Sequence, residues 1–116
     1  MADFPGKGQV AVVKTSPQTV LADIHALMKL ADFEQVLPKT NRTGLKINIS
    51  WQTWYPACST TPWQLEGVIQ MLQHAGYSDL VGIHNDTVVV DTSDGEVNNK
   101  HRFVTEKYNL PCLYLY

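Results

Sequence analysis

The 116-residue chain lacks the short motifs that identify several large classes of enzyme. It contains no GxGxxG, GxxxxGKS/T, HExxH or GxSxG pattern, which argues against dinucleotide-binding proteins, P-loop NTPases, zincin proteases and α/β-hydrolases. It also has no internal repeat and no low-complexity segment. The sequence therefore contains no motif that identifies a reaction, and it leaves open whether the protein is an enzyme.

Cysteine is scarce, and Cys58 and Cys112 are not spaced as CxxC. Two cysteines do not make the disulfide framework of a small secreted domain. We therefore expect reduced thiols in a cytoplasmic protein.

Positive charge is scarce and scattered: nine Lys and Arg stand against eleven Asp and Glu, with a net charge of −2 and a pI near 6.0. A nucleic-acid-binding protein normally carries a basic stripe, so we expect no nucleic-acid partner. The longest apolar runs have four or five residues, against the roughly 20 residues of a membrane helix. Residues 1–8 lack the features of an export signal. These absences predict a soluble protein without membrane contact.

The composition that remains is that of one globular domain. The apolar fraction is 44% and the charged fraction 17%, which is ordinary for a folded protein. A chain of this length can bury a core without disulfides or metals. Residues 1–8, with Pro5, Gly6 and Gly8, predict a flexible tail, and residues 9–116 predict a single α/β domain.

Hydrophobic periodicity predicts strands that alternate with helices. Strands are expected at residues 9–14, 45–51, 80–84 and 113–116, and residues 87–91 have strand-like composition. Helices are expected from Pro17 to about residue 37, from Pro62 to about residue 75 and over residues 99–108, with a turn at residues 93–95. This order predicts a three-layer α/β fold, in which a mostly parallel sheet of four to five strands has helices on both faces.

The last predicted strand, residues 113–116, is apolar and has no helix after it. A bare apolar edge invites pairing with another chain. We therefore expect a homo-oligomer or a partner subunit that completes this strand, or a chain derived from a longer ancestor.

Polar residues gather where the second predicted strand ends and the next helix begins. Ser59, Thr60 and Thr61 precede Pro62, so the free N–H groups of the helix start could hold an anion. Lys46 and Asn48 interrupt an otherwise apolar strand and could face the same ligand. The alternatives are plain helix capping by the hydroxyls and a Lys46 side chain that reaches out to water.

Aromatic residues crowd the loop between these elements. Trp51, Trp54 and Tyr55 could wall a binding site, or they could simply pack the loop. Cys58 lies in the same loop and could be a nucleophile if a base were near.

The third predicted strand ends in His84, Asn85 and Asp86. His84 could act as a catalytic acid or base or as a metal ligand, and Asp86 could orient it. The alternative is a packing or surface histidine. If the strands are adjacent, this triplet lies beside the aromatic loop.

These runs resemble the family catalogued as domain of unknown function 362, whose members have a Lys-Pro-Asn strand, a Thr-Pro helix start, a leucine-rich helix ending in Ala-Gly and a glycine-containing strand before a polar loop. The matching runs are residues 45–48, 59–62, 72–76 and 80–85, with Ile47 in place of the usual proline. The resemblance is to the N-terminal part of the family and implies an α/β fold without a known activity. Longer members often carry a cysteine-rich iron–sulfur segment. This chain has none, so no cofactor is expected.

Three functions fit these observations. The first is the binding of a small anionic molecule at the carboxyl edge of the sheet. The second is an interaction or oligomerisation subunit without catalysis. The third is an enzyme that uses His84, with or without a metal.

Overall fold

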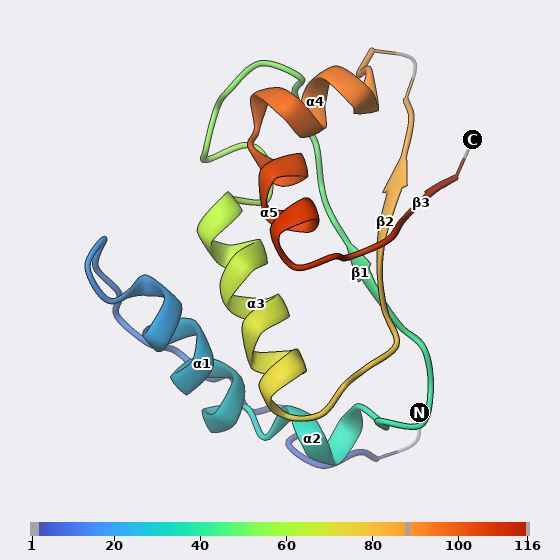
Figure 1. Ribbon diagram of the computed structural model, residues 1–116. Coiled ribbons are helices and arrows are strands. Elements are labelled where there is room, and N and C mark those ends of the chain that lie inside the picture. The colour runs from blue at the N-terminus through green and yellow to red at the C-terminus, as the bar shows by residue number, and fades with distance from the viewer. Residues whose placement is uncertain (1–2, 88, 116) are drawn as a thin grey trace.

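A computed structural model of the protein describes residues 3–87 and 89–115 (Figure 1). Its three strands form one all-parallel sheet in the order β1-β2-β3, which confirms the α/β class with a parallel sheet. The elements in chain order are α1 (Val20–Leu30), α2 (Phe33–Val36), β1 (Thr43–Lys46), α3 (Pro62–His74), β2 (Leu80–Asn85), α4 (Thr92–Asn98), α5 (His101–Lys107) and β3 (Cys112–Leu115).

The sheet has three strands in the described residues, where the sequence predicted four to five. Residues 9–14 form no strand, and Val10 and Val12 are 86% and 77% exposed. Their β-branched side chains favour extended backbone, but a strand also needs a neighbour with which to pair. Of the predicted strand at residues 87–91, residue 88 lies outside the described residues, and the described ones contain an isolated antiparallel bridge between Thr87 and Val90.

The helices of the described residues leave one face of the sheet bare, whereas the sequence predicted helices on both faces. Both crossovers, β1 to β2 and β2 to β3, step in the same direction across the sheet. Because such crossovers are right-handed, their helices fall on the same face. Figure 1 shows α3, α4 and α5 on that side, and α1 on the far side of α3. There Ile24 of α1 lies so close to Gly67 of α3 that an added Cβ would come within 2.9 Å of it.

The core lies between the inner face of the sheet and the helices α3 and α5. Side chains alternate along each strand, so Ile47, after β1, and Leu80 of β2 point inward. They pack in one cluster with Leu65, Ile69, Leu72, Tyr77, Val104 and Leu110. We call the opposite side of the sheet the helix-free face. By the same alternation it carries Lys46 of β1, Val81 and Ile83 of β2, and Leu113 and Leu115 of β3. Val81 is buried, whereas both leucines of β3 are exposed.

The segment after β2 differs from its prediction. Residues 93–95, expected as a turn, belong to α4, because Asp91 caps the helix by accepting a hydrogen bond from the Asp94 N–H at 2.9 Å. The predicted helix over residues 99–108 starts later, at His101, after Lys100 adopts a left-handed backbone with φ of 66°. Phe103 of this helix is 69% exposed, although it is a large apolar residue.

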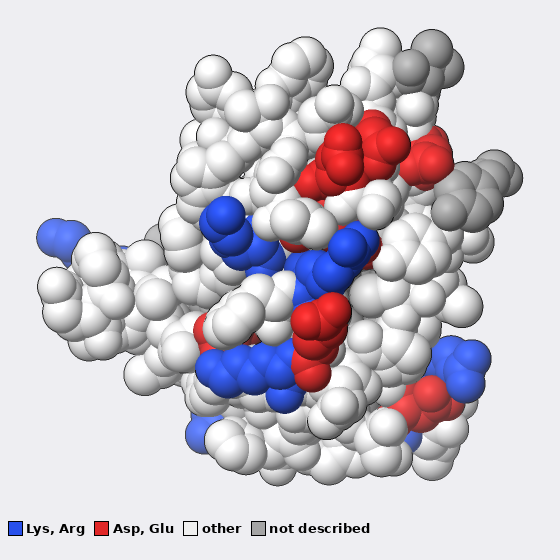
Figure 2. Space-filling model, turned by 45° about the horizontal axis from the view of Figure 1, so that its top comes forward, with Lys and Arg blue, Asp and Glu red and all other residues white. Residues whose placement is uncertain are grey.

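The charged side chains on the surface are mixed in sign. Figure 2 shows acidic and basic groups side by side on the face drawn, without a continuous basic stripe there. Lys107 and Glu66 form one such pair between α5 and α3, at 2.6 Å. Within the described ranges, no helix has the length and apolarity needed to cross a membrane.

Candidate functional site

The polar residues predicted at the start of α3 satisfy one another. Thr60 Oγ1 accepts a hydrogen bond from the Asn48 N–H at 3.0 Å, and the Thr60 N–H donates back to the Asn48 carbonyl, also at 3.0 Å. The Asn48 amide donates to Ser50 Oγ at 2.8 Å, and Ser59 Oγ accepts from the Ser50 N–H at 3.2 Å. Thr61 Oγ1 caps α3 by accepting from the backbone N–H of residue 64 at 3.3 Å. These contacts join the loop to β1 and use several of the predicted donors.

The aromatic loop forms a shallow depression of about 430 Å³. It is lined by Ser50, Trp51, Tyr55 and Cys58, so three of the predicted ligand-binding residues share one concave surface. Trp54 instead lies under the Lys100 ammonium group, 5.9 Å from its ring centre.

Lys46 and His84 lie on opposite faces of the sheet. Lys46 is exposed at the end of β1, where its Nζ donates to the Ile47 carbonyl at 3.3 Å. His84 lies on the inner face of β2 and is 1% exposed. The two residues after His84 are exposed, and both form hydrogen bonds with Thr92 at the start of α4. The Asn85 carbonyl accepts from Thr92 Oγ1 at 3.4 Å, and Asp86 Oδ1 accepts from the Thr92 N–H at 3.1 Å.

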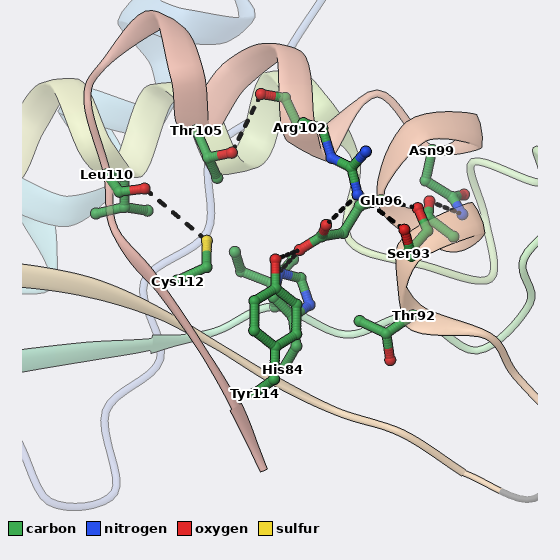
Figure 3. Close-up of polar contacts among 12 residues, drawn as sticks. His84, Thr92, Ser93, Glu96, Asn99, Arg102, Thr105, Leu110, Cys112 and Tyr114 are labelled. Atoms are coloured by element: carbon green, nitrogen blue, oxygen red, sulfur yellow. Dashed lines mark hydrogen bonds and ion pairs between the residues drawn. The ribbon is translucent and has the colours of Figure 1, made fainter. Parts of the chain in front are cut away.

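Glu96 of α4 is the centre of a buried polar cluster beneath β2 and β3 (Figure 3). It is 3% exposed. Its Oε1 accepts a hydrogen bond from the Tyr114 hydroxyl at 2.8 Å and lies 2.9 Å from His84 Nε2. Its Oε2 accepts from Arg102 Nη2 at 3.0 Å. A buried carboxylate needs such partners, and the half-exposed Arg102 supplies the balancing charge.

His84 itself is poorly satisfied. Although its Nε2 is close to Glu96, the contact is off the line of a ring N–H hydrogen bond. Neither ring nitrogen therefore has a hydrogen-bond partner among the described residues. The ring stacks on Tyr114, with centroids 5.6 Å apart and planes inclined by 15°. A buried polar group without a partner is uncommon and calls for an explanation.

Cys112 completes the cluster from the first position of β3. Its Sγ, a carboxylate oxygen of Glu96 and a ring nitrogen of His84 all lie within 4.8 Å of one another. Gly82, the β2 residue paired with Cys112, makes room for the thiol, because a Cβ there would lie 2.8 Å from Sγ. Glycine at this position therefore sets the depth at which the sulfur enters the inner face.

Burial controls protonation in this cluster. It lowers the pKa of His84 below its ordinary value, against the opposing pull of the Glu96 carboxylate. It raises the pKa of the Cys112 thiol, with Glu96 adding to the effect. Burial and the hydrogen bond to Glu96 raise the pKa of Tyr114 to about 12. The cluster at neutral pH therefore holds a neutral imidazole, a thiol and a phenol.

His101, at the start of α5, links the cluster to the loop. It is fully buried at 0% exposure, and its Nε2 is hydrogen-bonded to the Thr60 carbonyl at 2.5 Å. Burial lowers its pKa too, although the Thr60 carbonyl opposes the shift. Its charge in turn would disfavour a proton on His84.

The sequence pointed to His84 but missed its partners. Glu96 was missed because it follows the predicted turn at residues 93–95, in a segment where no helix was expected. Cys112 was considered only as one of two reduced thiols, and Tyr114 only as part of an apolar strand. Their alternate spacing, which places both on one face of a strand beside His84, was the signal that could have found them.

Comparison with known proteins identified no relative of this chain. No protein-family model, no curated protein and no solved structure matches this chain. The resemblance to domain of unknown function 362 stays a prediction.

Proposed function

We propose that the protein is a self-associating α/β subunit, in which the helix-free face of one copy packs against the same face of a second copy. The observation that carries this proposal is the exposure of Leu113 and Leu115, at 48% and 58%, on a parallel sheet. Parallel sheets are normally covered on both faces, because their strands are apolar on both sides. The second covered face that the sequence predicted would then come from the partner copy.

Charge and symmetry favour a second copy of this chain as the partner. Lys46 is the only Lys, Arg, Asp or Glu in the three strands, so two such faces meet with little like-charge repulsion. Two-fold dimers are the commonest oligomers, and their interfaces use the same patch on both copies. β3 is an edge strand within the described residues, and its sequence Cys-Leu-Tyr-Leu has none of the charges or prolines that protect free edges.

Sedimentation equilibrium over a concentration series tests this proposal. We expect a dimer whose dissociation constant rises at least about tenfold in the double variant Leu113→Lys, Leu115→Lys, since four added charges would meet across the two-fold axis. The matched control is Val97→Lys, because Val97 is 49% exposed but lies on α4. A wild-type monomer at the highest concentration tested, or a dimer unaffected by the β3 variant, would refute the proposal.

A second candidate function, the binding of a small anion, is supported by the depression formed by Ser50, Trp51, Tyr55 and Cys58. Trp51 is 47% exposed there and would stack on a ligand. Tryptophan fluorescence titrations with phosphate, sulfate and small carboxylates test it, with Trp51→Phe as the variant that should lose the signal and Trp63→Phe as the control. Unchanged fluorescence with every anion would exclude this candidate. Catalysis by His84 would need access to a side chain that is 1% exposed.

A further inference from the structure

We propose that His84, Glu96 and Cys112 form a binding site for a divalent transition metal of the zinc class. This site lies on the inner face of the sheet and does not depend on the proposed self-association. The three residues come from three separate elements, β2, α4 and β3, and only the fold brings them together (Figure 3). Their ligand atoms, one nitrogen, one oxygen and one sulfur, lie within 4.8 Å of one another.

The donor set selects the class of metal. Thiolate and imidazole are ligands of zinc and of neighbouring transition metals, whereas calcium and magnesium take oxygen ligands. In tetrahedral zinc sites, bonds of about 2.0 to 2.3 Å place neighbouring ligand atoms roughly 3.5 Å apart. The His84 and Glu96 atoms, at 2.9 Å, are slightly closer than that separation and would move apart by a few tenths of an ångström to hold a metal. The remaining approach falls to Cys112, which is half-buried on β3, an edge strand of the described sheet.

In the contacts described above, the nitrogen lone pair of the neutral His84 ring accepts no hydrogen bond. Its side chain is more than nine-tenths buried, and both ring nitrogens are unpartnered among the described residues. Nε2 lies beside a carboxylate oxygen, so a cation between the two would satisfy both atoms. The geometry therefore points to a bound cation that would use this nitrogen and the neighbouring carboxylate oxygen together.

The surroundings fit a metal in charge and orientation. A divalent cation with the Glu96 carboxylate and a Cys112 thiolate carries no net charge, and the positive charge of Arg102, whose side chain is 40% exposed, is partly solvated. Tyr114 and Arg102 hold Glu96 at 2.8 and 3.0 Å and would orient it as outer partners orient metal ligands. Three protein ligands leave one position of a tetrahedral set for water or a further ligand.

Cobalt(II) titration of the reduced protein tests the site, because cobalt replaces zinc and a cobalt–thiolate bond gives a charge-transfer band in the near ultraviolet. We expect the band to saturate at one cobalt per chain and to disappear when zinc is added. Cys112→Ser should lose the band and weaken binding by more than about 100-fold, since a lost ligand should cost more than a lost outer partner. Cys58→Ser is the matched control and should keep both.

Protection of the thiols gives a second measurement on the unaltered chain, in case Cys112→Ser does not fold. Zinc should slow the alkylation of Cys112 at least about tenfold, while Cys58, which is exposed, reacts at an unchanged rate. The proposal is overturned if no band forms or if Cys112→Ser keeps it. It is also overturned if binding is lost only on replacing His74, whose ring centre lies 5.9 Å from that of His25 and which offers an adventitious site.

Discussion

Apolar residues are usually buried and polar residues usually exposed, and the two faces of the sheet depart from this rule in opposite ways. The inner face buries a histidine and a carboxylate, His84 and Glu96, at 1% and 3% exposure. The helix-free face of the same strands exposes Leu113 and Leu115. Buried polar groups and exposed apolar patches are the informative exceptions in a fold. The comparison teaches that a single strand, β3, contributes to both exceptions. Its alternate residues lie in the buried polar cluster and on the exposed helix-free face.

Replacement of Glu96 should give the largest loss of stability. In Glu96→Gln, Arg102 loses its ionic partner and the Tyr114 hydroxyl loses a charged acceptor. Breaking a buried ion pair costs about 3–5 kcal/mol, and the 40% exposure of the Arg102 side chain reduces the expected loss to about 2–4 kcal/mol. Urea denaturation of the metal-free protein measures it.

The control for this variant is Glu106→Gln, on the exposed surface of α5, which should change the free energy of unfolding by less than about 0.5 kcal/mol. Equal losses in the two variants would mean that the buried cluster has no special role in stability.

Acidic pH should destabilise the inner face next most strongly. Because burial lowers the pKa values of His84 and His101, the unfolded chain takes up these protons first as the pH falls. Stability is therefore fully present above about pH 6.5, the ordinary pKa of histidine, and is lost below it, by up to about 1.4 kcal/mol per pH unit for each group.

Thermal or urea unfolding between pH 7.5 and pH 4.5, with a chelator present to keep metals away, follows this loss. The double variant His84→Gln, His101→Gln should flatten the slope over this range. If the free energy of unfolding of the variant falls with pH as steeply as that of the original chain, groups other than these two histidines cause the loss.

An added methyl group at Gly82 should separate β3 from β2. Its Cβ would lie 2.8 Å from Cys112 Sγ and 3.1 Å from Ile47 Cδ1. Overpacking of this kind costs typically about 1–3 kcal/mol. Adding Cys112→Ala should restore part of the stability in urea denaturation, because it removes the closer contact. An equal loss in the single and double variants would place the strain elsewhere.

A substitution on the helix-free face should affect stability least and association most. Leu115 is 58% exposed, so Leu115→Thr should change the free energy of unfolding of the monomer by less than about 0.5 kcal/mol. The same change should weaken self-association measured by sedimentation. A large loss of monomer stability with unchanged association would reverse the proposed difference between the two faces.

Much of the fold was predictable because local signals agreed with tertiary structure. Thr61 and Pro62 marked the start of α3, and the apolar runs around residues 45 and 80 marked β1 and β2. The failures have physical reasons. Residues 9–14 have strand-like composition but no neighbour, and strands exist only in pairs. The α4 helix was missed because Gly95 suggested a turn, whereas it allows the close packing of α4 on Ile49.

The polar site was less predictable than the fold. The sequence placed His84 near the end of a strand, beside the aromatic loop, and assigned Asn48 and Thr61 to a ligand site at the start of the next helix. In the structure, Asn48 and Thr61 serve the loop and the helix cap, and His84 faces Glu96 instead. Neighbouring residues on a strand point to opposite faces, so nearness in the sequence is a poor guide to nearness in a site.

By itself, the sequence determined where β1, α3 and β2 lie in the parallel α/β unit, because periodicity and capping act over a few residues. It also determined that β3 would carry apolar side chains that this chain leaves exposed. Only the tertiary structure decided that both crossovers lie on one face, and that Glu96 and Cys112 meet His84. These contacts join residues up to 28 positions apart (84 to 112). They depend on strand order and crossover handedness, which local periodicity does not encode.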